Sequence, residues 1–212
     1  MVALTIGSAF AFGLVAVAAL SGLTTGLETS LLVGVAEASR SVPGALPLLE
    51  AWTSLGAAAV VIPATAVLAI WRVAAGDRLG ALLALAIVVG ASAGNDVLQA
   101  LYGRPRPHLG LIDYPVPEGP GFPSGHAATS AAFVVALAIA LSRATSPPQR
   151  WRLGAVALVA LVAAGVGFSR LPLGVHYPTD VLGGWALALA WGGALSLAER
   201  TYRARSAAPS RR

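Results

Sequence analysis

The stretch LGALLALAIVVGASAGNDVLQALYGRPRP (residues 79–107) decides the fold class of this chain. Residues 79–95 carry no charged side chain, and the apolar character continues past Asp96 to Tyr102. A run of this length spans a bilayer as a helix, since spanning takes about 20 predominantly apolar residues. Two Arg-Pro pairs follow directly, and proline cannot continue an α-helix. The stretch therefore predicts a membrane span that ends in a stiff, basic loop.

The same pattern recurs along the 212 residues of the chain. Hydrophobic residues make up 57% of it, charged residues only 11%, and the mean hydropathy is +0.77. Soluble domains are about half apolar and a quarter charged, so the composition favours a membrane protein. Gly and Ala run through every apolar stretch, which suits close helix packing in lipid. We expect six spans, at about residues 2–24, 53–72, 79–102, 124–142, 153–170 and 177–198.

The expected fold is all-α, a bundle of six transmembrane helices that forms a single domain over residues 1–212. We expect the first run to be a retained membrane helix and not a signal peptide, because it lacks a basic start and its apolar run is too long. A short interfacial helix is predicted between spans one and two, with its apolar residues on one face and Glu28 elsewhere. Pro43 and Pro47 are expected to break this helix. A basic cytoplasmic tail is expected over residues 199–212.

The placement of arginine predicts the orientation, because cytoplasmic loops carry an excess of basic residues. With six spans, both termini and the loops after spans two and four share one side, which holds ten of the 14 arginines. We expect that side to be cytoplasmic and the protein to lie in the plasma (inner) membrane. The other side holds Arg40, Arg104, Arg106 and Arg170. Three of these lie in loops three and five, where the excess of basic residues on the cytoplasmic side does not explain them. We therefore expect these three arginines to have a function other than setting the orientation.

Several functions are disfavoured by the residue types present. The chain has no cysteine, so it can form no disulfide, thiolate metal site or cysteine nucleophile of its own. Its arginines are thinly spread and do not alternate with aromatic residues, which disfavours nucleic-acid binding. His108, His126 and His176 form no helical i, i+4 pair with one another, so a metal site with Asp180 lacks a familiar spacing. We expect neither a metal nor another cofactor, and the sequence indicates no oligomeric state.

The motif PSGH (residues 123–126) opens the fourth predicted span. Ser124 has the type and position of a helix N-cap, and Gly125 lets a ligand approach the backbone closely. The free amides of a helix start bind anions, and His126 would project beside such an anion from the first turn. The alternative is a capped helix with an interfacial histidine, which the tetrapeptide alone does not exclude.

The stretch SRLPLGVHYPTD (residues 169–180) leads into the sixth predicted span. His176 and Asp180 are four residues apart, which places them on one helical face. A carboxylate there fixes the tautomer of the imidazole and leaves its second nitrogen free to attack or to ligate. Arg170 supplies a planar donor fork for phosphate oxygens. The alternative is that Asp180 only caps the span, but an unpaired Asp near lipid is costly.

Together these residues resemble the three-part signature of the type 2 phosphatidic acid phosphatase (PAP2) superfamily. Arg106-Pro107 matches the first part, PSGH the second, and Ser169-Arg170 with His176 and Asp180 the third, in the order of the family. By the predicted topology, all three parts lie on the same extracytoplasmic face. The signature covers roughly residues 95–185.

The resemblance implies a metal-independent phosphatase that acts on a membrane lipid phosphate through a phosphohistidine at the extracytoplasmic face. The substrate class it implies is polyprenyl phosphate or diphosphate, phosphatidic acid or phosphatidylglycerol phosphate. It implies His176 as the nucleophile, Asp180 as the group that orients it, and His126 as general acid and base. The phosphate ligands that it implies are Arg106, Ser124, Gly125 and Arg170.

One position departs from the family pattern. The family has a lysine seven residues before the arginine of Arg106-Pro107, where this chain has Gln99, and the chain contains no lysine. We expect Arg104 to supply the missing charge to the phosphate, while Gln99 donates a hydrogen bond. One alternative is a substrate that needs less neutralisation, such as a monophosphate. The other is a weakly active or non-catalytic protein that binds or transports lipid phosphates.

A membrane carrier and a soluble haloperoxidase are two further classes of protein to consider. A carrier would fit six spans and an intramembrane Asp96, but we find neither inverted repeats nor broken helices. A soluble vanadium haloperoxidase shares a related site, but the predicted spans argue against it. In loop three, Asp113, Tyr114 and Glu118 either select the head group or are simply solvated.

Overall fold

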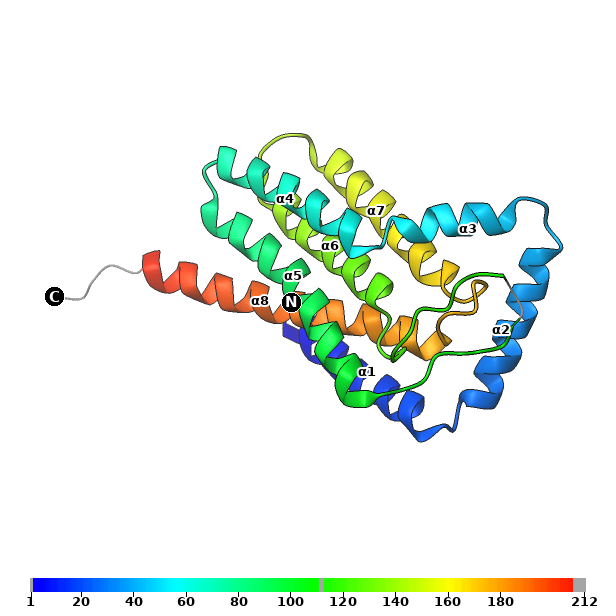
Figure 1. Ribbon diagram of the computed structural model, residues 1–212. Helices are drawn as coiled ribbons and strands as arrows, with labels where there is room; N and C mark the ends of the chain where they lie inside the picture. The colour runs from blue at the N-terminus through cyan, green and yellow to red at the C-terminus, as the bar shows by residue number, and fades with distance from the viewer. Residues whose placement is uncertain (1, 111–112, 208–212) are drawn as a thin grey trace.

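The computed structural model describes residues 2–110 and 113–207, and these residues form helices without any strand. Each helix corresponds to an apolar or amphipathic run of the sequence, and Pro or Gly stands near several of the boundaries, as it commonly does. The fold is therefore all-α, as predicted (Figure 1). The helices are α1 (Val2–Ser21), α2 (Thr25–Arg40), α3 (Ala45–Ser54), α4 (Ala58–Ala74), α5 (Arg78–Tyr102), α6 (Gly125–Ser142), α7 (Gln149–Ser169) and α8 (Pro178–Ala207).

Five helices are long and apolar enough to cross a membrane, namely α1, α5, α6, α7 and α8. The pair α3 and α4, bent by 46° at the break between them, is one further candidate. The prediction of an all-α protein with several membrane-spanning helices is confirmed, whereas the count of six stays a prediction. Helix α8 continues to Ala207, so much of the predicted tail (residues 199–212) is helical, and residues 208–212 lie outside the described part.

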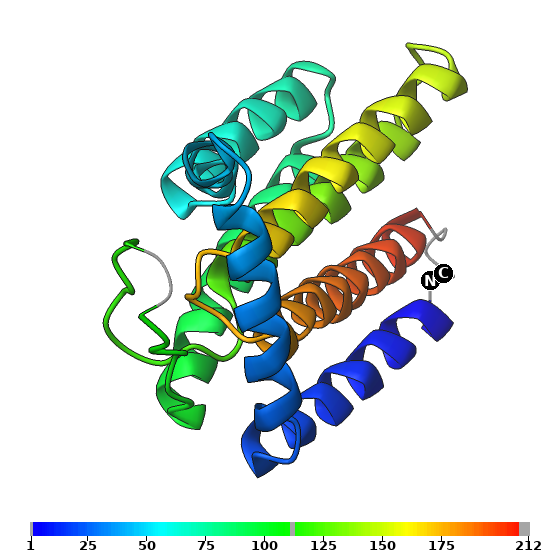
Figure 2. The same ribbon diagram turned by 90° about the vertical axis from the view of Figure 1, so that its right-hand side faces the viewer.

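Helix α6 lies at the centre of the bundle, in contact with α4, α5, α7 and α8, while α1 packs along α8 (Figure 2). Small residues allow this close packing. A Cβ atom on Gly184 of α8 would lie 2.6 Å from the carbonyl oxygen of Ser124, immediately before α6. The amino-terminal ends of α6 and α8 are thereby held side by side. The buried apolar core around them includes Ile87, Val88, Ala132 and Ala188.

The segment between α1 and α4 forms two helices, α2 and α3, instead of the single short helix predicted. The chain turns between them at Gly44, whose φ of +79° favours glycine. Pro47 does not break α3, because in the first helical turn its missing N–H has no intrahelical partner to lose. Figure 1 shows α2 crossing one end of the bundle. Glu28 also differs from the prediction, since it shares the buried face of α2 with Leu32.

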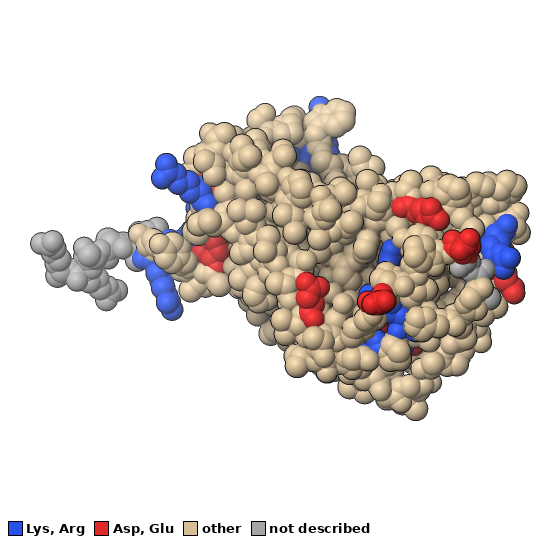
Figure 3. Space-filling view, viewed as in Figure 1, with Lys and Arg blue, Asp and Glu red and all other residues tan. Residues whose placement is uncertain are grey.

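Ion pairs tie the helices together at the end of the bundle away from α2. Asp77, between α4 and α5, pairs with Arg72 at 2.6 Å and with Arg203 of α8 at 2.5 Å. Glu199 of α8 pairs with Arg143, which follows α6, at 2.6 Å. On the face shown in Figure 3, charged side chains gather mainly at the two ends of the molecule. This separation of charged ends from a mostly uncharged middle is the pattern of a protein that lies in a bilayer.

Candidate active site

The three sequence motifs meet at one end of the bundle, where α5 ends and α6 and α8 begin (Figure 1). Arg106 Nη1 lies 2.8 Å from His176 Nε2. The backbone N–H of Ser124 donates to the backbone oxygen of Asp180 at 2.9 Å. A Cβ atom on Gly121 would lie 3.2 Å from both Arg106 Cγ and Asp180 Oδ2, so the loop approaches this closely because glycine stands there. The three motifs therefore lie together in the structure, as the sequence predicts.

His176 and Asp180 form a buried pair at the start of α8. His176 Nδ1 lies 3.4 Å from Asp180 Oδ2, a long contact of the kind that often tightens when a substrate binds. The same Oδ2 accepts from the backbone N–H of Tyr177 at 2.9 Å. Asp180 is the third residue of α8, and Tyr177 is its N-cap residue, so this bond is a capping bond of the helix. The same bond holds the Asp180 carboxylate in place. With Nδ1–H directed at Asp180, the lone pair lies on Nε2, where it accepts from Arg106 Nη1 at 2.8 Å.

Burial decides the protonation state of His176, which is 1% exposed. Burial lowers its pKa to about 4; Asp180 opposes this shift, and the charges of Arg106 and Arg170 reinforce it. His176 is therefore neutral at pH 7. A neutral imidazole with a fixed Nδ1–H carries its nucleophilic lone pair on Nε2.

Three buried donors near His176 have no hydrogen-bond partner within the described residues: Ser124 Oγ, Arg106 Nε and Arg170 Nε. Buried polar groups are nearly always paired, so unpaired ones point to a ligand. Ser124 occupies the N-cap position of α6 as predicted, but its hydroxyl makes no capping bond. Two arginines and a hydroxyl beside a helix amino terminus suit a bound oxyanion such as phosphate.

Arg170 is held by two residues outside the motifs. Its Nη1 donates to Thr53 Oγ1 at 2.9 Å, so α3 reaches the site. The side chain of Tyr114 also hydrogen-bonds to Arg170, which gives Tyr114 a fixed partner. Sequence reasoning left the role of Tyr114 open and did not find Thr53. No local signal marks Thr53, because it lies on an apolar helix far from Arg170 in the chain.

His126 lies half-buried in the first turn of α6. The charges of Arg106 and Arg170 act on it electrostatically, so it belongs to the same cluster. Gly125 precedes it, and a Cβ atom there would lie 3.2 Å from Asn95 Nδ2 of α5. The start of α6 therefore packs tightly on α5, which fixes the position of His126.

Gln99 and Arg104 are placed differently from the prediction. Gln99 Nε2 donates to the carbonyl oxygen of Pro123 at 2.7 Å and so holds the loop before α6. Arg104 Nη1 lies 2.5 Å from Asp180 Oδ1, and its Nη2 lies 2.7 Å from Glu28 Oε2. Arg104 thus pairs with two carboxylates instead of replacing the family lysine at a phosphate. The physical reason is that buried carboxylates require a paired cation.

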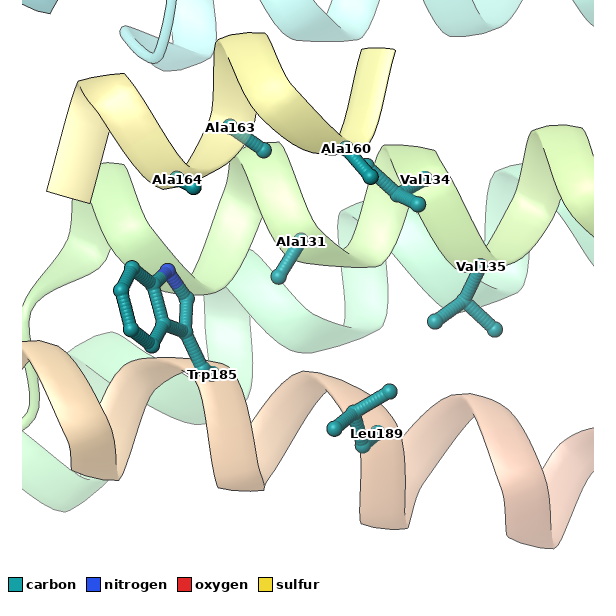
Figure 4. A pocket seen from close by; sticks show the side chains of 8 residues that line it. All are labelled: Ala131, Val134, Val135, Ala160, Ala163, Ala164, Trp185 and Leu189. Carbon is teal, nitrogen blue, oxygen red and sulfur yellow. The ribbon is translucent and has the colours of Figure 1, made fainter. Parts of the chain in front are cut away.

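An apolar cavity of about 250 Å³ lies between α6, α7 and α8. It begins close to the site, because Ala131 follows His126 by five residues on α6 and Trp185 follows Asp180 by five on α8. Ala164 on its wall is exposed, so the cavity opens at the surface of the bundle. Figure 4 shows the side chains that line it, namely Ala131, Val134, Val135, Ala160, Ala163, Ala164, Trp185 and Leu189.

Comparison with known proteins gives consistent sequence matches. A sequence profile described as the PAP2 superfamily matches residues 79–203, more than half of the chain. An undecaprenyl-diphosphatase of Sulfolobus acidocaldarius is 32% identical over 132 residues, 60% of this chain and 58% of that protein. A phosphatidylglycerophosphatase B of Bacillus subtilis is 33% identical over 95 residues, 45% and 46% of the two chains. A lipid A 1-phosphatase of Rhizobium etli is 32% identical over 127 residues, 56% and 48%. The chain thus spans about half the length of the curated relatives it matches.

A solved structure resembles most of the chain. The crystal structure of the first transmembrane PAP2 type phosphatidylglycerolphosphate phosphatase from Bacillus subtilis matches with a TM-score of 0.80. The match covers 93% of this chain and 96% of that one, at 22% sequence identity. The two proteins therefore share a fold.

Proposed function

The chain belongs to the PAP2 superfamily, and from this premise we propose that it is an integral-membrane lipid phosphate phosphatase that works through a phosphohistidine on His176. The observation that carries the proposal is a neutral His176, oriented by Asp180, beside buried donors without a partner in the described part of the chain. Phosphoryl transfer requires this combination of an activated nucleophile and fixed positive charge. The donor atoms are Arg106 Nε, Arg170 Nε and Ser124 Oγ.

The proposed reaction has two steps. In the first, the Nε2 lone pair of His176 attacks phosphorus, the bond from phosphorus to the leaving oxygen breaks, and His126 gives that oxygen a proton. The leaving group is a lipid alcohol for a monoester and a lipid monophosphate for a diphosphate. In the second step, His126 takes a proton from water, the water oxygen attacks phosphorus, and the P–N bond breaks. Inorganic phosphate and free His176 are then restored.

Charge on the transferring phosphoryl group is stabilised by Arg106, Arg170, the Ser124 hydroxyl and the Gly125 amide at the start of α6. Because guanidinium groups and helix amides neutralise the phosphate in this proposal, the reaction does not depend on a divalent metal. Asp180 stabilises the positive charge that develops on the imidazole of His176 during attack.

The proposed substrate is a lipid whose phosphate enters the site while its tail stays in the bilayer. The apolar cavity between α6, α7 and α8 supports this, since it begins within two helical turns of His126 and Asp180 and opens at the surface. The relatives are named for undecaprenyl diphosphate, phosphatidylglycerophosphate and lipid A. We therefore keep polyprenyl phosphate or diphosphate, phosphatidic acid and phosphatidylglycerol phosphate as the substrate class.

The arginine distribution supports an orientation for this proposal. Both termini and the Asp77 ion-pair cluster lie on the cytoplasmic side of the plasma membrane, and the site lies on the extracytoplasmic side. A lipid phosphate of the outer leaflet then reaches the site without crossing the bilayer.

A second candidate function is a weakly active or non-catalytic binder or transporter of lipid phosphates. Two placements favour it. Gln99 holds the Pro123 carbonyl, and Arg104 is paired with Asp180 and Glu28, so neither supplies the charge of the family lysine.

Phosphate release from a panel of lipid phosphates separates the two functions. The purified protein in detergent is given phosphatidic acid, phosphatidylglycerol phosphate and polyprenyl mono- and diphosphates, with and without a chelator. We expect release of inorganic phosphate from at least one of them, persistence of that release with chelator, and inhibition by vanadate. Binding without release from any member would favour the binder.

The lowered pKa of His176 predicts an unusual pH dependence. The nucleophilic form of His176 is neutral, so the loss of activity that His176 causes at acid pH should occur as pH drops through its pKa in the folded protein, about 4. The acid limb that His176 contributes to kcat/KM should therefore lie well below the ordinary histidine pKa of about 6.5. Two soluble phosphate esters whose phosphates titrate differently control for substrate ionisation. An acid limb at about 6.5 with both esters would contradict a neutral, buried nucleophile.

Filling the apolar cavity should weaken binding of long lipid tails. In Ala164→Phe, we expect KM for a long-chain lipid phosphate to rise about tenfold, since losing two buried methylenes costs about 0.8 kcal/mol each. KM for a short-chain, soluble phosphate ester should not change. The matched control is Ala157→Phe, an exposed position of the same helix outside the cavity. Equal KM values for all three proteins would show that the tail lies elsewhere.

A further inference from the structure

Glu28 is a buried acidic residue that the proposed mechanism does not use. It lies on α2, the helix that crosses the end of the bundle. Its side chain faces the bundle, and the residue is only 3% exposed. Its Oε2 accepts from Thr24 Oγ1 at 2.9 Å and from Arg104 Nη2 at 2.7 Å. Its Oε1 accepts from the backbone N–H of Thr179 at 2.9 Å and from Thr179 Oγ1 at 2.7 Å. Glu28 thus joins α2 to the first turn of α8, directly beside Asp180.

Glu28 is ionised in this setting. Burial alone would raise its pKa, but the hydrogen bonds from Thr179 and Arg104, together with the charge of Arg104, outweigh burial and hold the pKa below its usual value. A charged group is retained at a buried position when its partners are in place. Both partners of Glu28 connect it to Asp180: Arg104 bonds the Asp180 carboxylate, and Thr179 precedes Asp180 in the chain.

Arg104 divides its guanidinium between two carboxylates. Nη1 bonds Asp180 Oδ1 and Nη2 bonds Glu28 Oε2, and the guanidinium stacks over the ring of Tyr177 at 4.5 Å. Asp180 Oδ2 is therefore left to His176 Nδ1 and to the backbone N–H of Tyr177. A guanidinium prefers to bind one carboxylate with both arms. The division persists because Glu28 holds the second arm.

We propose that Glu28 is a positioning residue for the reaction: it holds one arm of Arg104 and thereby keeps Asp180 Oδ2 free to orient His176. Without Glu28, Arg104 turns both arms toward Asp180 and competes for Oδ2. His176 then loses the partner that fixes its tautomer, although every group that touches the phosphate is still present. This inference rests on the proposed function, because it assigns Glu28 to the same site.

The first test compares Glu28→Gln with Glu37→Gln, an exposed acid on the same helix. Glutamine keeps the length and the acceptor toward Thr179 but opposes Arg104 with an N–H group. We expect kcat for phosphate release to fall by roughly 10–100-fold, as loss of an outer partner of a site typically does. KM should stay within about threefold, since Glu28 does not touch the phosphate, and Glu37→Gln should match the wild type.

A double-mutant cycle separates positioning from simple anchoring of α2. If Glu28 acts through Arg104, Glu28→Gln should change kcat by less than about twofold in an Arg104→Gln background, since the arm it holds is gone. An equal fall in kcat in both backgrounds would overturn the inference and show that Glu28 only anchors α2 to α8. A wild-type kcat in Glu28→Gln would overturn it as well.

Glu28→Asp provides a second variant if Glu28→Gln does not fold. It keeps the charge but shortens the reach, so kcat should fall less than in Glu28→Gln and KM should again hold. Unchanged kcat in Glu28→Asp, when Glu28→Gln is unfolded, would overturn the inference. Wild-type protein that releases no phosphate from any lipid of the panel would overturn the proposed function instead, and this inference with it. The two failures are therefore distinguishable in one set of assays.

Discussion

Replacing His176 with alanine is expected to lower phosphate release by roughly 10⁴–10⁶-fold, the range seen when a catalytic nucleophile is removed. No other side chain near the site combines a neutral nucleophilic atom with an oriented partner, among the residues that the structure describes. The measurement is the rate of phosphate release from the best lipid of the panel. His108→Ala is the matched control, since His108 is exposed and lies in loop three; its activity should match the wild type.

The variant must be folded for this result to count. Thermal unfolding in detergent should show a stable bundle, and vanadate should still bind, because Arg106 and Arg170 remain. Folded His176→Ala with wild-type turnover would mean that another group attacks phosphorus. The phosphohistidine step would then be wrong even if the protein is a phosphatase.

Asp180→Asn is expected to lower kcat by about 10²–10⁴-fold, toward the loss seen when a carboxylate that fixes a catalytic imidazole becomes an amide. Asp180 accepts on both oxygens, from Arg104 on one side and from His176 and the Tyr177 amide on the other. Asparagine has only one oxygen. Its NH₂ group must therefore oppose a donor, either Arg104 or the Nδ1–H of His176.

Asp96→Asn is the control for this change, because Asp96 is an exposed acid on α5. Its phosphate release should stay within about twofold of wild type, as for most surface substitutions. The same variant also bears on the carrier alternative, in which Asp96 has a functional role. Loss of activity in Asp96→Asn with normal activity in Asp180→Asn would reverse the roles assigned to the two residues.

The helices and the central pair of the site are readable from the sequence because local rules fix them. Gaps between charges mark apolar runs long enough to span a bilayer, and five of these runs form helices that are long and apolar enough to do so, namely α1, α5, α6, α7 and α8. The four-residue spacing of His176 and Asp180 predicts that the two side chains lie together, and they do, although His176 precedes α8 instead of lying on it. Arg106 and PSGH join them because loops on one face of a bundle lie close to one another.

The environment of this pair depends on partners far apart in the chain, and periodicity does not reveal them. Glu28 seemed to belong to the polar face of an interfacial helix, yet Arg104 and Thr179 provide a polar partner inside the bundle. Arg104 lies close in sequence to Gln99, the position of the family lysine, which favours it as a replacement. Its pairing with Asp180, 76 residues further along the chain, leaves no local signal in the sequence. Thr53 lies on a helix that sequence reasoning did not separate from the membrane spans. Each of these contacts joins elements more than 70 residues apart.

Trapping the phosphorylated protein tests the central claim most directly. Wild-type protein is mixed with a lipid substrate that carries radiolabelled phosphate, quenched in base within one turnover, and digested for peptide mapping. We predict a label that is stable to base and labile to acid, as a phosphoramidate is, on the peptide containing His176 and absent from His176→Ala. A label on Ser124 or His126, with His176 unmodified, would contradict the proposed mechanism.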